Sequence, residues 1–375
     1  MLMERGFDAR YVPTGHIVFG RSETLLAVPF NLGRLEVIGG PVPVIEDVME
    51  TTALYATGGS HFSFSDTGSL IFLSADVLAQ ARLLWVDRQG AIEQVTENRA
   101  GYRSVRVSPD GQRLAVEIED GVRRTIVLYD IARDAFSPLT TEGNNAAPQW
   151  SPDGQWVVFM SDRTGNWDLY RKRADFSGRS EHLLAKDHRQ SPVGFSPDGQ
   201  LLLFIDEHPT NLNDIWVLPL DGDQEPWPFL ETPLYDTLPD LSPDGRWLAY
   251  QQRDYLGGSE IYVQAFPNPG AKWQISTDGG VAPLWSPDGR ELFYSNGGQT
   301  VSVTVDTTSE FTAGTPRPLF RSPVGSGYGY DRHITPDGER FVWAAFDDEA
   351  AVLRGRQLHV VLNWFDELER LVPTN

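Results

Sequence analysis

Residues 150–159 read WSPDGQWVVF, and the Ser-Pro-Asp-Gly near their start decides the fold. Proline fixes φ at about −65° at the second position of a tight turn, and aspartate tolerates the position that follows. Glycine then adopts a positive φ, which is costly for other residues. The serine hydroxyl can bond a backbone amide of the turn. Because apolar residues flank the turn, the segment predicts a hairpin whose Trp150 and alternate residues after Gly154 point into a core.

The same signature recurs about every 45 residues from one end of the chain to the other. Copies at 195–204, 241–250 and 285–294 are nearly identical to the first, and one at 107–116 matches well. The remaining copies are 334–343 (ITPDGERFVW), the degenerate 64–73 (FSDTGSLIFL) and the weakest, 11–20 (YVPTGHIVFG). The turn glycines of the eight copies are Gly15, Gly68, Gly111, Gly154, Gly199, Gly245, Gly289 and Gly338.

Each hairpin is followed by a third and a fourth strand, as in residues 214–218 (DIWVL) and 226–230 (PWPFL). Four strands per repeat make one propeller blade, and blades must stack radially to bury both faces. We therefore predict an all-β fold with a single β-propeller domain over residues 1–375. Eight four-stranded blades are favoured, with residues 83–86 (LLWV) as the third strand after Gly68 and residues 1–5 closing the ring. Seven blades are the alternative, because residues 365–372 (FDELERLV) could supply the closing outer strand.

Composition excludes several classes of protein. The chain is 40% hydrophobic and 22% charged, which is typical of a globular protein. Its net charge of −21 disfavours nucleic acid and anionic membrane surfaces as partners. The absence of cysteine excludes disulfides and thiolate-bound zinc. We also expect no signal peptide at residues 1–9 and no membrane insertion, because no run of 18 apolar residues occurs.

Ser-Pro-Asp-Gly at this period resembles the PD40 (WD40-like) repeats of the TolB propeller family. Residues 161–170 (SDRTGNWDLY) look like that family's connection between second and third strands. Segments such as 83–90 (LLWVDRQG), 260–267 (EIYVQAFP) and 360–364 (VVLNW) look like the C-terminal propeller region of bacterial, acidobacterial-type serine/threonine protein kinases. The chain has no glycine-rich phosphate loop, His-Arg-Asp or Asp-Phe-Gly motif. The resemblance therefore implies a sensor or interaction role without kinase activity.

The catalytic motifs of other propeller proteins are absent. No Gly-x-Ser-x-Gly occurs, and none of the seven histidines has a helical metal-ligand spacing. His61 and His333 lie just ahead of their turns and could face the channel together, although ordinary strand histidines are the favoured interpretation. Asp221, Asp223 and Glu225 could bind Ca²⁺ weakly, but they lack the spacing of an EF-hand loop. We expect no catalytic residue and no cofactor, with Ca²⁺ or another divalent metal as the alternative.

The repeated aspartates of the turns are interpreted as turn formers, so the informative positions are those where the repeat varies. Residues three to five before the turn serine approach the mouth of the central channel and differ from blade to blade. A mixture of Arg, Asp, Asn and Tyr suits a peptide or polar ligand, and a merely hydrated channel is the alternative. The predicted ligand-binding residues are His61, Arg103, Asn145, Arg189, Gln190, Asp236, Tyr330, Asp331, Arg332 and His333.

These features predict a non-catalytic, monomeric binding or sensor propeller whose channel face binds a protein, a peptide or a small polar ligand. The alternative is a stand-alone metal-dependent lyase or hydrolase with its active site at the channel mouth. A kinase-linked sensor would lie outside the cytoplasm, in the periplasm, and a stand-alone propeller would be cytoplasmic.

Overall fold

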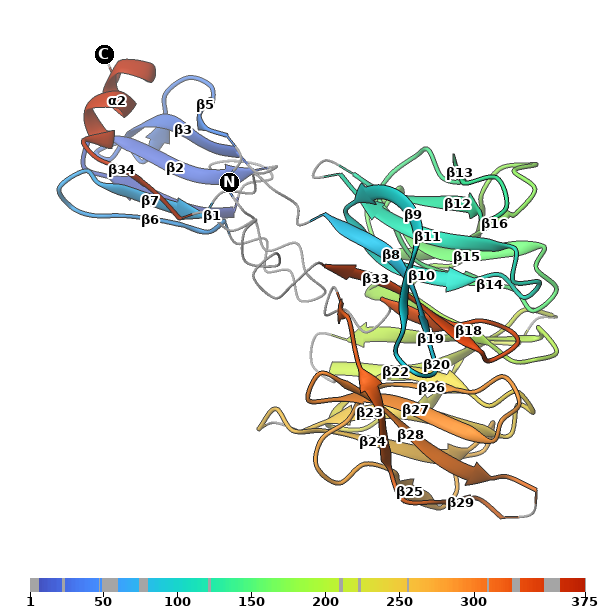
Figure 1. Ribbon diagram of the computed structural model, residues 1–375. Helices are drawn as coiled ribbons and strands as arrows, with labels where there is room; N and C mark the ends of the chain where they lie inside the picture. Colours follow the sequence, from blue (N-terminus) through green and yellow to red (C-terminus); the bar gives the residue numbers. More distant parts are fainter. Residues whose placement is uncertain are drawn as a thin grey trace. The chain divides into compact units, whose positions relative to one another are not determined.

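The structure is a computed structural model that describes residues 7–21, 24–46, 48, 60–73, 80–120, 123–208, 212–221, 224–254, 256–308, 310–325, 331–346 and 358–374. Its contacts divide the chain into two compact units. Unit 1 comprises Met1–Ala79 and Glu349–Asn375, and unit 2 comprises Gln80–Asp348. Antiparallel sheets dominate both units, which confirms the predicted all-β class (Figure 1).

The described part of unit 2 forms six antiparallel sheets, five of which use strands that are consecutive in the chain. The first sheet is β10 (Tyr102–Val107), β11 (Arg113–Glu119), β12 (Arg124–Asp130) and β13 (Ala135–Pro138). The second is β14 (Asn145–Trp150), β15 (Trp156–Ser161), β16 (Asp168–Arg173) and β17 (Glu181–Leu184). The third is β18 (Arg189–Phe195), β19 (Leu201–His208), β20 (Leu212–Pro219) and β21 (Trp227–Leu230). The fourth is β22 (Tyr235–Leu241), β23 (Trp247–Arg253), β24 (Ser259–Ala265) and β25 (Lys272–Gln274). The fifth is β26 (Val281–Trp285), β27 (Glu291–Asn296), β28 (Gln299–Asp306), β29 (Thr312–Ala313) and β30 (Arg317–Arg321).

The sixth sheet joins the two ends of unit 2. It combines β31 (Val324–Gly325), β32 (Arg332–Ile334) and β33 (Arg340–Phe346) with β8 (Ala81–Asp87) and β9 (Ile92–Ala100). β33 pairs with β8 along its length, with Phe341 opposite Val86, and Figure 1 shows blue β8 beside red β33. The prediction that residues 83–86 follow the hairpin at Gly68 is therefore wrong. Local sequence makes these residues a strand but does not encode which hairpin they join.

Packing of one turn on the next closes unit 2 into a ring. Each turn glycine has φ between 67° and 74° and faces the turn proline of the preceding sheet. The glycine–proline pairs are Gly111–Pro336, Gly154–Pro109, Gly199–Pro152, Gly245–Pro197, Gly289–Pro243 and Gly338–Pro287. Since the first pair joins the first sheet to the sixth, the six contacts form a closed cycle. Ser-Pro-Asp-Gly therefore shapes a hairpin and also joins neighbouring sheets.

Replacing Gly245 with alanine should destabilise unit 2 by about 2 kcal/mol, because the new Cβ meets two costs. The backbone has φ 72°, and a Cβ would lie 3.1 Å from Pro197 Cδ. Gly178 has φ 70° with nothing within 4 Å of its Cβ position, so Gly178→Ala carries the backbone cost alone. Chemical denaturation should therefore show a lower free energy of unfolding for Gly245→Ala than for Gly178→Ala. Equal losses would mean that the glycine–proline contact contributes nothing.

Unit 1 contains two described sheets. One is β1 (Phe7–Val12), β2 (His16–Arg21), β3 (Thr24–Asn31) and β4 (Glu36–Val37), with β5 (Val42–Ile45) also paired to β3. The other is β6 (Phe62–Phe64), β7 (Leu70–Leu73) and β34 (Leu358–Val361). The third strand after Gly68 is thus β34, from the far end of the chain.

Helix α2 (Trp364–Leu371) corrects the prediction that residues 365–372 supply a closing strand. Trp364 and Leu368 are buried on one face, a spacing of four that fits a helix and not a strand. Their side chains complete a core with Phe62, Leu70 and Phe72. Residues 1–5, predicted to close the ring, lie outside the described residues.

The division into two units differs from the predicted single domain of eight blades. Gly15 and Gly68 belong to unit 1, whereas the other six turn glycines belong to unit 2 and contact one another's sheets in a cycle. A single domain would unfold in one cooperative transition. The number of domains therefore stays a prediction that unfolding can test.

Candidate functional site

The inner strands of unit 2 give its centre two distinct ends. These strands are β10, β14, β18, β22, β26 and β32, and each runs into a Ser-Pro-Asp-Gly or Thr-Pro-Asp-Gly turn. We call the end formed by the turns the turn end, and the end where the inner strands begin the loop end. A central cavity of about 300 Å³, the turn-end cavity, is lined by residues from all six inner strands. Any site here is therefore assembled from the whole ring.

The polar wall of the turn-end cavity comes mainly from the residue two positions before the turn. Arg106, Gln149, Asp240 and His333 occupy this position in four sheets, and Arg332 adds a second guanidinium. Burial raises the pKa of Asp240 to about 6, and the charge of Arg106 opposes that rise. Burial, together with Arg106, lowers the pKa of His333 to about 3. The histidine is therefore neutral at physiological pH.

Several cavity residues also bond one sheet to the next. Asp240 Oδ2 accepts a hydrogen bond from the backbone N–H of Trp285 at 2.6 Å, and His333 Nδ1 accepts one from Val107 at 3.3 Å. The indole N–H of Trp150 donates to the carbonyl of Arg106 at 3.1 Å, and that of Trp285 donates to the carbonyl of Asp240 at 3.2 Å. Asp240 and His333 thus make the same kind of bond, each accepting the backbone N–H of the residue before the turn in the next sheet. Part of the sequence variation at the channel therefore serves structure.

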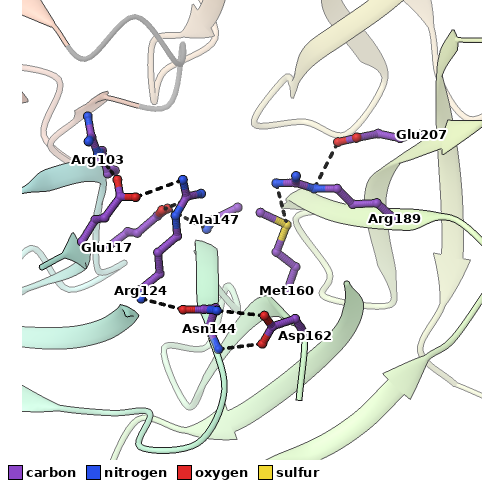
Figure 2. A network of polar contacts seen from close by, with 10 residues as sticks. Arg103, Glu117, Arg124, Asn144, Ala147, Met160, Asp162, Arg189 and Glu207 are labelled. Atoms are coloured by element: carbon purple, nitrogen blue, oxygen red, sulfur yellow. Dashed lines mark hydrogen bonds and ion pairs between the residues drawn. The ribbon is translucent and has the colours of Figure 1, made fainter. Parts of the chain in front are cut away.

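The loop end carries a network of charged side chains, shown in Figure 2. Arg103 Nε lies 2.6 Å from Glu119 Oε2, and Arg124 lies 3.4 Å from Glu119 and 3.7 Å from Glu117. Glu117 also accepts a hydrogen bond of 3.0 Å from the backbone N–H of Ala147, a bulge residue with φ 52°. Burial raises the pKa of Glu117, and Arg124 opposes the rise. This network holds the second inner strand against the first sheet.

Other loop-end residues are held by neighbouring side chains. Arg163 donates to Asn145 Oδ1 at 2.9 Å. Arg189 lies 3.3 Å from Glu207, whose pKa burial raises to about 7. Asp236 is fully buried and accepts bonds from Thr232 (2.5 Å) and Gln252 (2.7 Å). These contacts satisfy part of the loop end, whereas the buried amide of Gln190 has no hydrogen-bond partner among the described residues.

The structure separates the ten residues predicted to bind a ligand. Arg332 and His333 line the turn-end cavity. His61 is exposed and belongs to unit 1, and Tyr330 lies outside the described residues. Asp331 is buried and directly precedes β32. The five others begin inner strands at the loop end and do not line the cavity: Arg103, Asn145, Arg189, Gln190 and Asp236.

Sequence reasoning missed Arg106, Gln149 and Asp240 because, His333 apart, it chose residues three or more positions before the turn. The position two before the turn holds Arg, Gln, Gly, Asp, Leu and His in the six sheets, so it varies as strongly. That variation was the available signal.

Two further observations bear on function. Within the described ranges, no group of three or more His, Asp or Glu side chains lies close enough to hold a metal ion. Asp223, one of the three residues considered for Ca²⁺, lies outside those ranges. No helix in the described part of the chain is long and apolar enough to cross a membrane.

Six antiparallel sheets that share a central cavity and interlocking turns define unit 2 as a β-propeller. The family described as PD40, the TolB β-propeller domain, matches residues 79–226. An uncharacterized protein of Agrobacterium fabrum is 30% identical over 264 residues, covering 65% of this chain and 84% of the relative. The chain belongs to this family of TolB-like β-propellers.

Other relatives support the same family. The Tol-Pal system protein TolB of Francisella tularensis subsp. holarctica is 25% identical over 205 residues, which is 53% of this chain and 47% of that protein. The chain thus spans about half the length of that relative. The solved structure of a putative TolB from Agrobacterium tumefaciens matches with a TM-score of 0.55 at 18% identity. It covers 72% of this chain and 99% of that one, which supports the fold alone.

Proposed function

We propose that the chain is a non-catalytic, monomeric propeller that binds a segment of another protein at one end of its central channel. The turn-end cavity is the observation that carries this proposal. It is lined by all six sheets, and its polar side chains do not repeat around the ring. Several relatives are named as the Tol-Pal system protein TolB, and this likeness supports a protein-binding role. The proposal requires no cofactor.

The proposed mechanism of binding is that the ring holds the binding residues in fixed positions. The closed ring fixes the inner strands, so their ends offer preformed positions and lose little conformational entropy on binding. Charged side chains that differ around the ring would select the partner through complementary charge. An extended protein segment, entering along the channel axis, would contact several sheets at once.

Peptide selection tests this function without a known partner. A displayed library of random peptides should yield binders to the full chain. Their affinity should fall at least about tenfold in Arg106→Gln, because interfacial charges typically contribute this much when buried. Titration of fluorescently labelled peptides by anisotropy measures the change.

Two matched variants locate the binding end. Arg103→Gln removes the same charge at the loop end, and Arg179→Gln removes it from an exposed site. Loss of binding in Arg103→Gln alone would assign the site to the loop end, as the sequence predicted. Binding that survives both channel variants, or that never emerges from the library, would contradict the proposed function.

The kinase-linked sensor role is a narrower form of the proposal. It is supported by the resemblance of segments 83–90, 260–267 and 360–364 to kinase-linked propellers. A coding sequence for a kinase domain and a membrane helix directly upstream would support it and would place the propeller outside the cytoplasm. A tol gene neighbourhood would contradict it.

A further inference from the structure

Two buried guanidinium groups lie in the turn-end cavity of a chain whose net charge is −21. Arg106 is 8% exposed and Arg332 is 4% exposed. Arg332 donates to the hydroxyl of Ser295 and, at 2.5 Å, to the carbonyl of Ala282. Arg106 donates to Gln149 Oε1 at 3.1 Å and to the carbonyl of Arg332 at 3.2 Å. These acceptors are neutral oxygens that fix the positions of the guanidiniums. The buried carboxylate of Asp331, which directly precedes β32, also acts on Arg332 and opposes the fall in its pKa that burial causes.

Among the residues that line the cavity, Asp240 is the one carboxylate, and Asp331 acts on Arg332 from outside the lining. Oδ2 of Asp240 accepts the backbone N–H of Trp285, and burial raises the pKa of Asp240 to about 6. His333 adds no charge, because burial and Arg106 lower its pKa to about 3. Among the lining residues, two positive charges therefore face one negative charge at neutral pH, and they face none once Asp240 is protonated.

The apolar walls of the cavity strengthen the electrostatic interactions that these charges make. Trp150, Trp285 and Leu284 are buried in its lining, together with prolines of the turns. Electrostatic interactions are stronger beside such apolar surface than in water. The aspartates of the turns are absent from the lining, and each accepts the hydroxyl of its own turn, as Asp244 does from Ser242 at 2.6 Å. Being close to solvent, they are screened by salt more than the buried guanidiniums are.

We propose that the turn-end cavity binds a carboxylate group, held by the charges of Arg106 and Arg332. The group would be the C-terminus of a bound protein segment or a small organic acid. A cavity of about 300 Å³ has room for two or three residues or for a small dicarboxylic acid, but not for a folded partner. This inference rests on the proposed function in placing the protein segment at the turn end.

Calorimetric titration of the full chain with four probes tests the chemistry and its source. Acetyl-Ala-Ala with a free C-terminus is compared with its amide, and succinate is compared with succinamide. At least one acid should bind about tenfold or more tightly than its neutral partner, because only the acid carries the charge. A preference confined to the peptide identifies a protein C-terminus, and one confined to succinate identifies a small acid. Equal binding of acids and amides, or none, overturns the proposal.

Two substitutions in the cavity should change the binding of the peptide acid in opposite directions. Arg106→Gln should weaken binding of the peptide acid by about tenfold, whereas Asp240→Asn should strengthen it by a similar factor at about pH 7.5. Asparagine can still accept the N–H of Trp285, so this variant preserves the fold. Arg290→Gln, an exposed change of equal charge on a neighbouring turn, should have no effect. A gain in Asp240→Asn cannot arise from misfolding, and its absence contradicts the proposal.

The titration of Asp240 determines how the affinity for the peptide acid should change with pH. Its pKa of about 6 makes the cavity more positive as pH falls, so wild-type affinity for the peptide acid should rise between about pH 7.5 and about pH 5. The C-terminal carboxyl stays ionised over this range. Asp240→Asn should abolish the rise, and a rise that persists in the variant contradicts the role of Asp240.

The two proposals fail separately. Library peptides that bind equally well after C-terminal amidation would leave the proposed function standing and remove the carboxylate site. Succinate binding without any selected peptide would do the reverse.

Discussion

Replacing Phe341 with alanine is expected to lower the free energy of unfolding of unit 2 by about 3–5 kcal/mol. Phe341 is fully buried in β33, the strand that joins the two ends of unit 2 through its pairing with β8. Its ring lies 5.1 Å from that of Phe293 in the fifth sheet and 5.6 Å from that of Phe320, measured between centroids. The side chain therefore packs the sixth sheet against the fifth. Its loss leaves a cavity where the ring closes.

Differential scanning calorimetry measures this effect. A loss of that size should lower the midpoint of the unit 2 transition by roughly 10 °C. Phe176→Ala is the matched control, because Phe176 belongs to the same unit and its side chain is 43% exposed. If Phe341→Ala were no more destabilising than Phe176→Ala, the packing of Phe341 on Phe293 and Phe320 would not stabilise unit 2.

The hairpin repeat was predictable because its information is local. In all six turns of unit 2 the Ser or Thr hydroxyl donates to the aspartate Oδ1 at 2.5–2.6 Å. This confirms that the aspartates shape the turns. The serine bond is the largest influence lowering the pKa of Asp110, Asp153 and Asp198. Four residues specify such a turn, so one sequence suffices to find it.

Ring closure was not predictable because it is not local. Residues 81–85 alternate between buried and partly buried side chains, which suits the third strand of any hairpin in the chain. Their actual partner, β33, lies more than 250 residues away in sequence. The hairpin at Gly68 takes its third strand from β34 instead. Only packing of whole sheets distinguishes these pairings, and their contribution does not appear in a short window of sequence.

The binding residues were hardest to predict because variation has two causes at the channel. Glu117 and Gln251 stand nine residues after their turn serines, and their side chains accept the backbone N–H groups of Ala147 and Ala282. Both alanines have positive φ, so one structural role is filled by two residue types. Non-repeating residues thus do not by themselves mark a ligand site. Charged side chains that line a cavity are the better guide, and they point to Arg106 and Arg332.

Replacing Trp364 with alanine is expected to destabilise unit 1 by about 3–5 kcal/mol and to leave the unit 2 transition unchanged. Trp364 is fully buried and stacks on Phe64 with ring centroids 6.0 Å apart. Its backbone N–H donates to the carbonyl of Gly68 at 2.7 Å, so it joins α2 to the hairpin of β6 and β7. Calorimetry of this variant and of Phe341→Ala should move different transitions.

Trp364→Phe separates packing from hydrogen bonding at this position. The indole N–H of Trp364 is buried and has no hydrogen-bond partner among the described residues, which costs roughly 1–3 kcal/mol. Phenylalanine removes that group and keeps most of the apolar contact, so Trp364→Phe should cost far less than Trp364→Ala. Leu362→Ala, at a 70% exposed site two residues earlier, should have little effect. If Trp364→Ala and Phe341→Ala instead shift one common transition, the chain unfolds as a single cooperative domain, as its continuous repeat predicts.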